Sequence, residues 1–173
     1  VARTAKVSKA TVYSYFPDKQ RLFIEVVKAE CEHMAEHAME EIDQGHNIHD
    51  VLGKAAGYMV NFFLSEFSQR MFRICVAEAD RIPELGRQFY ENGPIMGRQH
   101  IAEYLRKAHA KGEIEVTDFE LAADQFAELC KATLWPQAVF GIRSEFNDAE
   151  KQKVVSAAVE TFCTAYAPKK DAR

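Results

Sequence analysis

VSKATVYSYFPDK, residues 7–19, is the stretch from which the rest of the chain is interpreted. Ser8 predicts an N-cap, because its hydroxyl can accept a hydrogen bond from a free backbone N–H in the first turn. A short helix is expected from Lys9 to Phe16, ending before Pro17 because proline disfavours helical geometry at the preceding residue. At about 3.6 residues per turn, Val12 and Phe16 share one face, which is expected to pack on a core.

Another face of this helix carries groups that suit a nucleic-acid duplex. Ala10 leaves room for close approach. The face also presents a cation and several hydroxyls, which belong to Lys9, Thr11, Tyr13, Ser14 and Tyr15. Such groups can contact phosphate oxygens and base edges in a major groove. Residues 1–5 predict the end of another helix, and two short helices joined by a tight turn form a helix-turn-helix.

Here the sequence resembles TetR-type bacterial transcription regulators, over VARTAKVSKATVYSYFPDKQRLFIEVV at residues 1–27. The resemblance implies that base edges are met by Lys9, Ala10 and Ser14, and phosphates by Thr11, Tyr13, Tyr15 and Lys19. It also implies a small core formed by Val7, Val12, Phe16, Leu22 and Phe23. A first helix, absent from this chain, would complete that core. The alternative is a capped amphipathic helix in an unrelated bundle.

Lys6 departs from that family's pattern, because glycine usually stands at this place in the turn. A left-handed backbone there would cost a lysine about 1–2 kcal/mol. The turn is therefore expected to be mildly strained or slightly different.

The composition is that of an ordinary globular protein, with 173 residues, 47% apolar and 28% charged. The sequence has no apolar run of about 18 residues and no signal peptide, which predicts a cytoplasmic protein without membrane contact. The net charge of −4 is unevenly placed. Residues 1–21 hold five basic residues and one acidic residue, a net +4, so the remainder carries −8. A basic head on an acidic body is consistent with a local DNA contact.

Asp18 predicts the N-cap of a long helix that runs to about Ile42. We therefore expect residues 1–42 to form the DNA-binding helix-turn-helix with its connecting helix, and residues 43–173 to form a ligand-binding and dimerisation domain. Within the long helix, His33, Glu36 and His37 follow the H-x-x-E-H order of one class of zinc peptidases. A solvated helix face is the favoured alternative, because no downstream acidic ligand with matching spacing stands out.

The remaining sequence predicts an all-α fold, with a helix-turn-helix joined by a long helix to a helical body. The expected helices of the body span residues 48–66, 68–80, 84–91, 95–111, 117–140 and 147–167. Asn92-Gly93-Pro94 is expected to end one of them, and Pro136 to kink another by removing a hydrogen bond. The sole strand candidate, residues 113–116, has a position that suits a loop.

The body resembles the C-terminal domain of AefR-like TetR regulators, over RICVAEADRIPELGRQFYENGP and GEIEVTDFELAADQFAELCKATLW. The resemblance implies a small-molecule effector and a homodimer paired through the last two helices. The pairing faces would contain Ala122, Phe126, Leu129, Thr133, Phe140, Val155, Ala158, Val159, Phe162 and Tyr166. The alternative is that these faces are buried within one chain. A two-fold dimer suits a palindromic operator, because one recognition helix reads only half a site.

Trp135-Pro136 marks the predicted effector site, because a proline kink can open space beside the indole ring. Large soft side chains with a few polar ones would form an apolar pocket with few polar anchors. The predicted set is Phe63, Met71, Met96, His100, Tyr104, Trp135 and Gln137.

The sequence thus predicts a sequence-specific DNA-binding transcriptional regulator, a repressor released from its operator by a small, largely apolar ligand. The alternative is a helical ligand-binding dimer that no longer reads DNA. An enzyme is not expected, because the chain shows no Gly-rich phosphate loop, no G-x-S-x-G and no paired carboxylates in an apolar setting. No cofactor or metal is expected. The four separated cysteines indicate buried reduced thiols, with a redox switch as the alternative.

Overall fold

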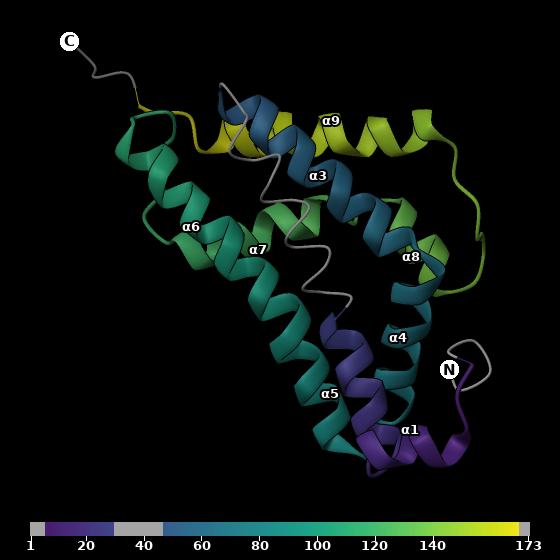
Figure 1. Cartoon of the computed structure of the whole chain (residues 1–173). Coiled ribbons are helices and arrows are strands. Elements are labelled where there is room, and N and C mark those ends of the chain that lie inside the picture. The colour runs from purple at the N-terminus through teal and green to yellow at the C-terminus, as the bar shows by residue number, and fades with distance from the viewer. Residues whose placement is uncertain (1–5, 30–46, 170–173) are drawn as a thin grey trace.

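The fold is built from helices joined by turns and loops (Figure 1). The computed structural model describes residues 6–29 and 47–169, and no strand occurs in these two ranges. Residues 19–29 are helical. The other elements are α1 (Lys9–Tyr15), α3 (Ile48–Leu64), α4 (Glu66–Ala77), α5 (Pro83–Tyr90), the π-helical turn η1 (Glu91–Ile95), α6 (Met96–Ala110), α7 (Phe119–Leu129), α8 (Leu134–Val139) and α9 (Asp148–Ala165). The predicted all-α class is confirmed.

Side-chain caps explain where the first helices begin. Ser8 Oγ accepts a hydrogen bond from a backbone N–H in the first turn of α1 at 3.0 Å. The helix ends before Phe16, which precedes proline and is extended with a φ of −125°. Asp18 Oδ1 accepts from the N–H of Arg21 at 2.7 Å and caps the following helix. Both predicted N-caps are confirmed.

The turn before α1 has the strained backbone that the sequence led us to consider. Lys6 has a φ of +54°, a left-handed conformation that glycine adopts without a steric penalty. Of the expected small core, Val12 and Phe16 are partly buried, whereas Val7 is 43% exposed. Val7 does not pack as expected because it lies between the turn and the cap, outside the buried face of α1.

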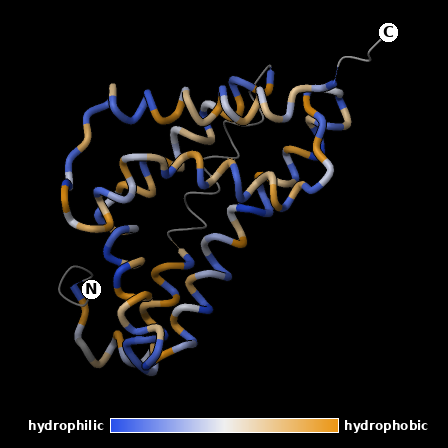
Figure 2. Tube along the Cα trace, turned by 180° about the vertical axis from the view of Figure 1, so that it is seen from behind, coloured by the Kyte–Doolittle hydropathy of each residue, from blue (hydrophilic) through white to orange (hydrophobic). Residues whose placement is uncertain are grey.

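The body is organised around one hydrophobic core. α3 runs along α9 and α6 runs along α7, and these two pairs make the most extensive contacts among the described elements (Figure 1). Hydrophobic and hydrophilic residues alternate along the helices (Figure 2), as expected when one face of each is buried. At the centre, the rings of Phe126 and Phe162 meet edge to face with centroids 5.2 Å apart.

The faces expected to pair two chains are mostly buried within one chain. The core includes Ala122, Phe126, Val155, Ala158, Val159 and Phe162. Leu129 and Tyr166 pack against this core, whereas Phe140 is 80% exposed. Burial within one chain therefore holds for most of these side chains, because α3 and α7 both pack on α9.

The prediction that Asn92-Gly93-Pro94 ends a helix is wrong. The chain continues from α5 through η1 into α6 without a break. The wider π-helical turn accommodates Pro94, which lacks an N–H, and Asn92 Nδ2 donates to the carbonyl of Gln88 at 2.8 Å.

The single helix predicted for residues 117–140 is also wrong. Residues 130–133 form a turn that separates α7 from α8. Pro136 lies in the first turn of α8, where a missing N–H leaves no helical hydrogen bond unmade, so it does not kink a continuous helix. Residues 113–116 form a loop, as predicted.

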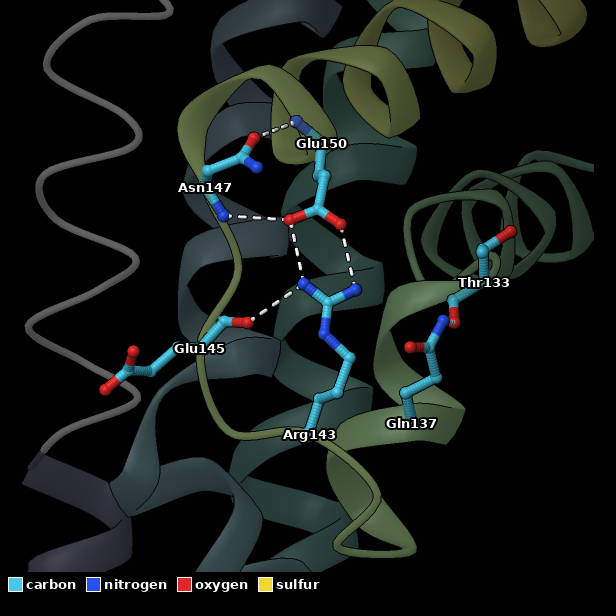
Figure 3. Close-up of polar contacts among 6 residues, drawn as sticks. All are labelled: Thr133, Gln137, Arg143, Glu145, Asn147 and Glu150. Atoms are coloured by element: carbon cyan, nitrogen blue, oxygen red, sulfur yellow. Dashed lines mark hydrogen bonds and ion pairs between the residues drawn. The ribbon is translucent and has the colours of Figure 1, made fainter.

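The start of α9 is held by a capping box that is joined to the preceding loop (Figure 3). Asn147 Oδ1 accepts from the N–H of Glu150 at 2.9 Å, and Glu150 Oε2 accepts from the N–H of Asn147 at 3.0 Å. Arg143 donates to both carboxylate oxygens of Glu150, at 2.8 and 3.0 Å. The Arg143 hydrogen bonds lower the pKa of Glu150, so the carboxylate stays charged and the loop stays tied to the helix.

Three predicted features lie outside the described residues. They are the connecting helix beyond residue 29, the H-x-x-E-H motif of His33, Glu36 and His37, and Cys31.

Candidate functional site

The outer surface of α1 presents residues that were selected from the sequence for contact. Tyr13 is 48% exposed and Tyr15 is 78% exposed. The other exposed members of this set are Ala10, Thr11, Ser14 and Lys19. Lys9 is the first residue of α1, but the position of its side chain is outside the described part of the structure. The opposite face is partly buried, so this surface of α1 is the one that faces solvent.

The hydroxyls of Thr11 and Ser14 on this surface already have partners, in the N-cap residue and within the helix. The hydroxyls of Ser8 and Thr11 lie 2.8 Å apart. Ser14 Oγ donates to the carbonyl of Thr11 at 2.7 Å. Ser14 therefore has its proton engaged and its oxygen free to accept, which favours a donor such as the amino group of adenine or cytosine in a major groove.

A group of aromatic rings around one ammonium joins α3, α4 and the start of α8. Lys131 Nζ lies 5.3 Å from the ring centroid of Phe63 and 5.6 Å from that of Trp135, within range of cation–π attraction. The rings of Phe72 and Trp135 meet edge to face with centroids 5.1 Å apart. Lys131 also pairs with Glu128 at 2.5 Å. We call Phe63, Phe72, Lys131 and Trp135 the aromatic cluster.

The structure brings together only part of the predicted effector set. All seven side chains are partly buried, but only Phe63 and Trp135 belong to the aromatic cluster. Met71 lies on α4, one residue before Phe72. Gln137 Nε2 donates to the carbonyl of Thr133 at 2.9 Å, so its amide supports the first turn of α8 (Figure 3).

The other three predicted side chains lie on α6. Met96, His100 and Tyr104 follow one another at intervals of four residues and so share a face of this helix. Tyr104 packs against the core, and burial raises the pKa of its hydroxyl to about 12, so it remains a neutral donor. α6 packs chiefly on α7. The described contacts therefore divide the predicted set into an α6 group and a group at the aromatic cluster.

The predicted effector set left out three residues of this region, namely Phe72 and Lys131 of the cluster and the neighbouring Gln69. Gln69 precedes Phe72 by three residues and shares its face of α4, yet Gln69 is only 5% exposed. A polar residue in register with a partly buried aromatic side chain is the signal that could have identified it. No sequence pattern shows that Lys131 lies over rings from two different helices.

A neighbouring contact ties α4 to the end of α8. Arg73 Nε donates to the carbonyl of Val139 at 3.0 Å, and its Nη2 donates to the carbonyl of Ala138 at 2.6 Å. These carbonyls lie in the last turn of α8, and that of Ala138 also accepts from the backbone N–H of Gly141 at 3.0 Å. Arg73 therefore couples the position of α8 to that of α4.

Thr133 carries backbone strain between Lys131 and Trp135. It has a φ of +66° and a ψ of −49°, and the N–H of Leu134 donates to the carbonyl of Ala132 at 2.7 Å. This is the geometry of a classic γ-turn, which is rare and strained, and a β-branched side chain makes it less favourable. Strain of this kind costs about 1–3 kcal/mol and is maintained by the surrounding packing.

Thr133→Gly is expected to relieve this strain and raise the midpoint of thermal unfolding by about 2–4 °C, since a gain of about 1 kcal/mol shifts a protein of this size by that amount. Thr133→Ala is the matched control, because alanine keeps the Cβ atom that opposes positive φ. Calorimetry of the wild type and the two variants tests whether the backbone at Thr133 is strained. An alanine variant that gained as much stability as the glycine variant would refute it.

A separate groove of about 740 Å³ lies between α3 and α9. It is lined by His49, Gly53, Gln152, Val155, Ser156, Val159, Glu160, Cys163, Thr164 and Ala167. None of the seven predicted effector residues lines this groove. The groove therefore does not correspond to the site expected at Trp135-Pro136.

The described cysteines are buried thiols. Burial raises the pKa of Cys75 to about 11 and that of Cys130 to about 12, so the reactive thiolate is scarce at neutral pH. Within residues 6–29 and 47–169, no group of His, Cys, Asp or Glu side chains is arranged to hold a metal ion. None of the helices in the same ranges is both long enough and apolar enough to cross a membrane.

Comparison with known proteins identifies both parts of the chain. Residues 50–168 match the C-terminal domain of AefR-like transcriptional repressors, and residues 1–26 match the tetR family of bacterial regulatory proteins. The chain is 30% identical to the flavonoid-responsive regulator FrrA, covering 98% of this chain and 85% of FrrA with a TM-score of 0.75. It is 28% identical to a TetR-family regulator from Mesorhizobium loti MAFF303099, covering 96% and 84% of the two chains with a TM-score of 0.85.

A more distant structure shows the same fold. FadR from Bacillus subtilis, solved in complex with stearoyl-CoA, is 16% identical over 94% of this chain and 84% of FadR, with a TM-score of 0.70. A comparison with curated proteins finds no significant match. The two matches cover the helix-turn-helix region at residues 1–26 and most of the remaining helices at residues 50–168. The chain therefore belongs to the TetR family of bacterial transcriptional regulators.

Proposed function

We propose that this protein represses transcription by binding a palindromic operator as a homodimer, and that a small, largely apolar effector releases it. The observation that carries the proposal is the outward, hydroxyl-rich surface of α1, which is followed directly by a capped helix at residues 19–29. Residues 1–42 would form the DNA-binding unit, and residues 43–173 the effector-binding and dimerisation unit.

In this proposal the α1 surface enters the major groove. Lys9, Ala10 and Ser14 face base edges, while phosphates are held by Thr11, Tyr13, Tyr15 and Lys19. The exposure of Tyr13 and Tyr15 supports these roles, because an exposed aromatic ring with a hydroxyl can reach a phosphate without a change in the fold. The net charge of +4 on residues 1–21 supports the same placement.

Pairing would use the outer faces of the last helices. Leu121 on α7 is 52% exposed, and Phe140 and Ile142 after α8 are 80% and 70% exposed. Such apolar side chains are suited to burial against a second copy. A two-fold arrangement would place two α1 helices on successive half-sites of a palindrome.

The effector would bind in the body, near residues drawn from Phe63, Met71, Met96, His100, Tyr104, Trp135 and Gln137. The aromatic cluster favours a flat aromatic compound, because aromatic rings beside a cation attract such ligands. The flavonoid response of FrrA supports the same class of ligand. The hydrogen bonds of Arg73 join α8, which carries Trp135, to α4, so a ligand that shifts one helix would also shift the other.

The test is selection of genomic fragments bound by the full-length protein, followed by gel mobility of a selected operator with and without flavonoids. We expect retention of a palindromic fragment and its release by an aromatic ligand. A protein that forms dimers and binds the ligand but retains no fragment would be the alternative, a ligand-binding dimer that does not read DNA. A strictly monomeric protein would contradict the proposal.

A further inference from the structure

Gln69 holds a buried hydrogen-bond acceptor that is not used within the described structure. Its side-chain amide nitrogen donates to the carbonyl of Phe63 at 2.5 Å. Its Oε1 is shut off from solvent, and no described residue donates a hydrogen bond to it. Since almost all buried polar atoms in proteins have a partner, this oxygen requires an explanation.

The orientation of the amide is determined by its surroundings. Rotating it by half a turn would place Oε1 against the Phe63 carbonyl, so that two acceptors would face each other. Oε1 is therefore the free acceptor, and only a hydrogen-bond donor can satisfy it.

The position of Gln69 relates this oxygen to the aromatic cluster. Phe72 lies three residues further along α4 on the same face and contacts Trp135, while the Gln69 amide is bonded to the backbone of Phe63. Phe63 and Trp135 in turn share the ammonium of Lys131. Gln69 is thus linked to two members of the cluster, by a hydrogen bond to Phe63 and by its position one turn before Phe72 on α4.

The same region contains the strained turn at Thr133, and α8 is held to α4 by Arg73. The strain held at Thr133 would be released if α8 moved, which lowers the cost of such a shift. Displacement of α8 or α3 from α4 is therefore the simplest route by which a ligand could reach Gln69.

We propose that Gln69 Oε1 accepts a hydrogen bond from a hydroxyl or N–H group on a flat aromatic effector that inserts beside Phe63 and Trp135. The inference rests on the proposed function, and it specifies the ligand as an aromatic compound with a donor group. No described residue donates a hydrogen bond to Oε1, so a donor on the ligand would add a contact that the described packing does not make. A ligand shifts an equilibrium through such differential contacts.

The probes are 7-hydroxyflavone, which carries one donor, and unsubstituted flavone, which carries none. Affinities are measured by calorimetry. Quenching of the sole tryptophan, Trp135, reports whether either compound binds beside the cluster. Wild-type protein is expected to bind 7-hydroxyflavone about 10-fold more tightly than flavone, the effect of one buried hydrogen bond. Gln69→Met keeps the length of the side chain and is expected to abolish this preference while flavone affinity stays within about twofold.

Asn92→Leu is the matched control. Asn92 also donates its side-chain amide to a backbone carbonyl, that of Gln88, but it lies in η1 and is not part of the cluster. This variant should retain the 10-fold preference. Thermal unfolding of both variants identifies any general loss of structure. If Gln69→Met does not fold, Gln69→Asn replaces it. This variant keeps an amide but shortens the side chain by one methylene, and it should also lose the preference for 7-hydroxyflavone.

The outcomes separate this inference from the proposed function. The inference would be overturned if wild type bound both probes equally, or if it bound neither. Equal binding would point to a buried water as the partner of Oε1. Persistence of the preference in the Gln69 variants would also overturn it. Operator binding measured without ligand tests the proposed function alone. If the protein binds the operator but does not prefer 7-hydroxyflavone over flavone, only the inference about Gln69 is refuted.

Discussion

Phe126→Ala is expected to lower the free energy of unfolding by about 3–5 kcal/mol, the usual loss when a buried phenylalanine is truncated. Phe126 is completely buried, and its ring packs edge to face on Phe162 at 5.2 Å. Alanine would leave a cavity where α7 meets α9, and the surrounding helices could close it only in part. Urea unfolding followed by circular dichroism measures the loss.

Val76→Ala is the control for this prediction. Val76 is 60% exposed on α4, so its truncation removes little buried surface and should change the unfolding free energy by less than about 0.5 kcal/mol. The essential result is that Phe126→Ala lowers the unfolding free energy more than Val76→Ala does. Similar losses for both would mean that Phe126 is not at the centre of the core.

Lys9→Ala is expected to relax the choice of operator sequence, with about 1–3 kcal/mol less discrimination between the operator and a scrambled fragment. The reason is that the first residues of a recognition helix meet base edges in the major groove. Lys19→Ala is expected to behave differently. As a phosphate contact, it should weaken binding to both fragments equally and reduce the slope of log affinity against log salt by about 1.

Titration of both fragments at several salt concentrations separates the two roles. Each lysine variant serves as the control for the other, because both remove one positive charge from the same head. An unchanged sequence preference in Lys9→Ala would show that the base-contact assignment is wrong. An unchanged salt slope in Lys19→Ala would exclude that residue as a phosphate contact.

The helix starts could be predicted from sequence because caps are local. Ser8, Asp18 and Asn147 each accept a hydrogen bond from an N–H three residues further on, so both partners lie within one short stretch. The strain at Lys6 could be considered for the same reason, since it depends on one residue in one turn. The exposed face of α1 follows from helical periodicity alone.

The break between α7 and α8 could not be predicted in this way. Helical propensity continues through residues 130–133, yet Thr133 adopts a strained turn in which packing outweighs local preference. Pro94 shows the converse, because a residue that normally ends a helix is accommodated by a wider turn. In both cases neighbouring elements determine the backbone.

The sequence by itself determined the helical class, the exposed surface of α1 and the family, because these depend on caps, periodicity and contiguous motifs. Only the tertiary structure decided which apolar faces are buried within the chain, and which residues from α3, α4 and α8 meet around Lys131 and Gln69. Those contacts join positions far apart in the sequence, and the free energy of each depends on how whole helices pack. A stripe of apolar residues indicates that a face will be buried, but the partner that buries it is selected in three dimensions.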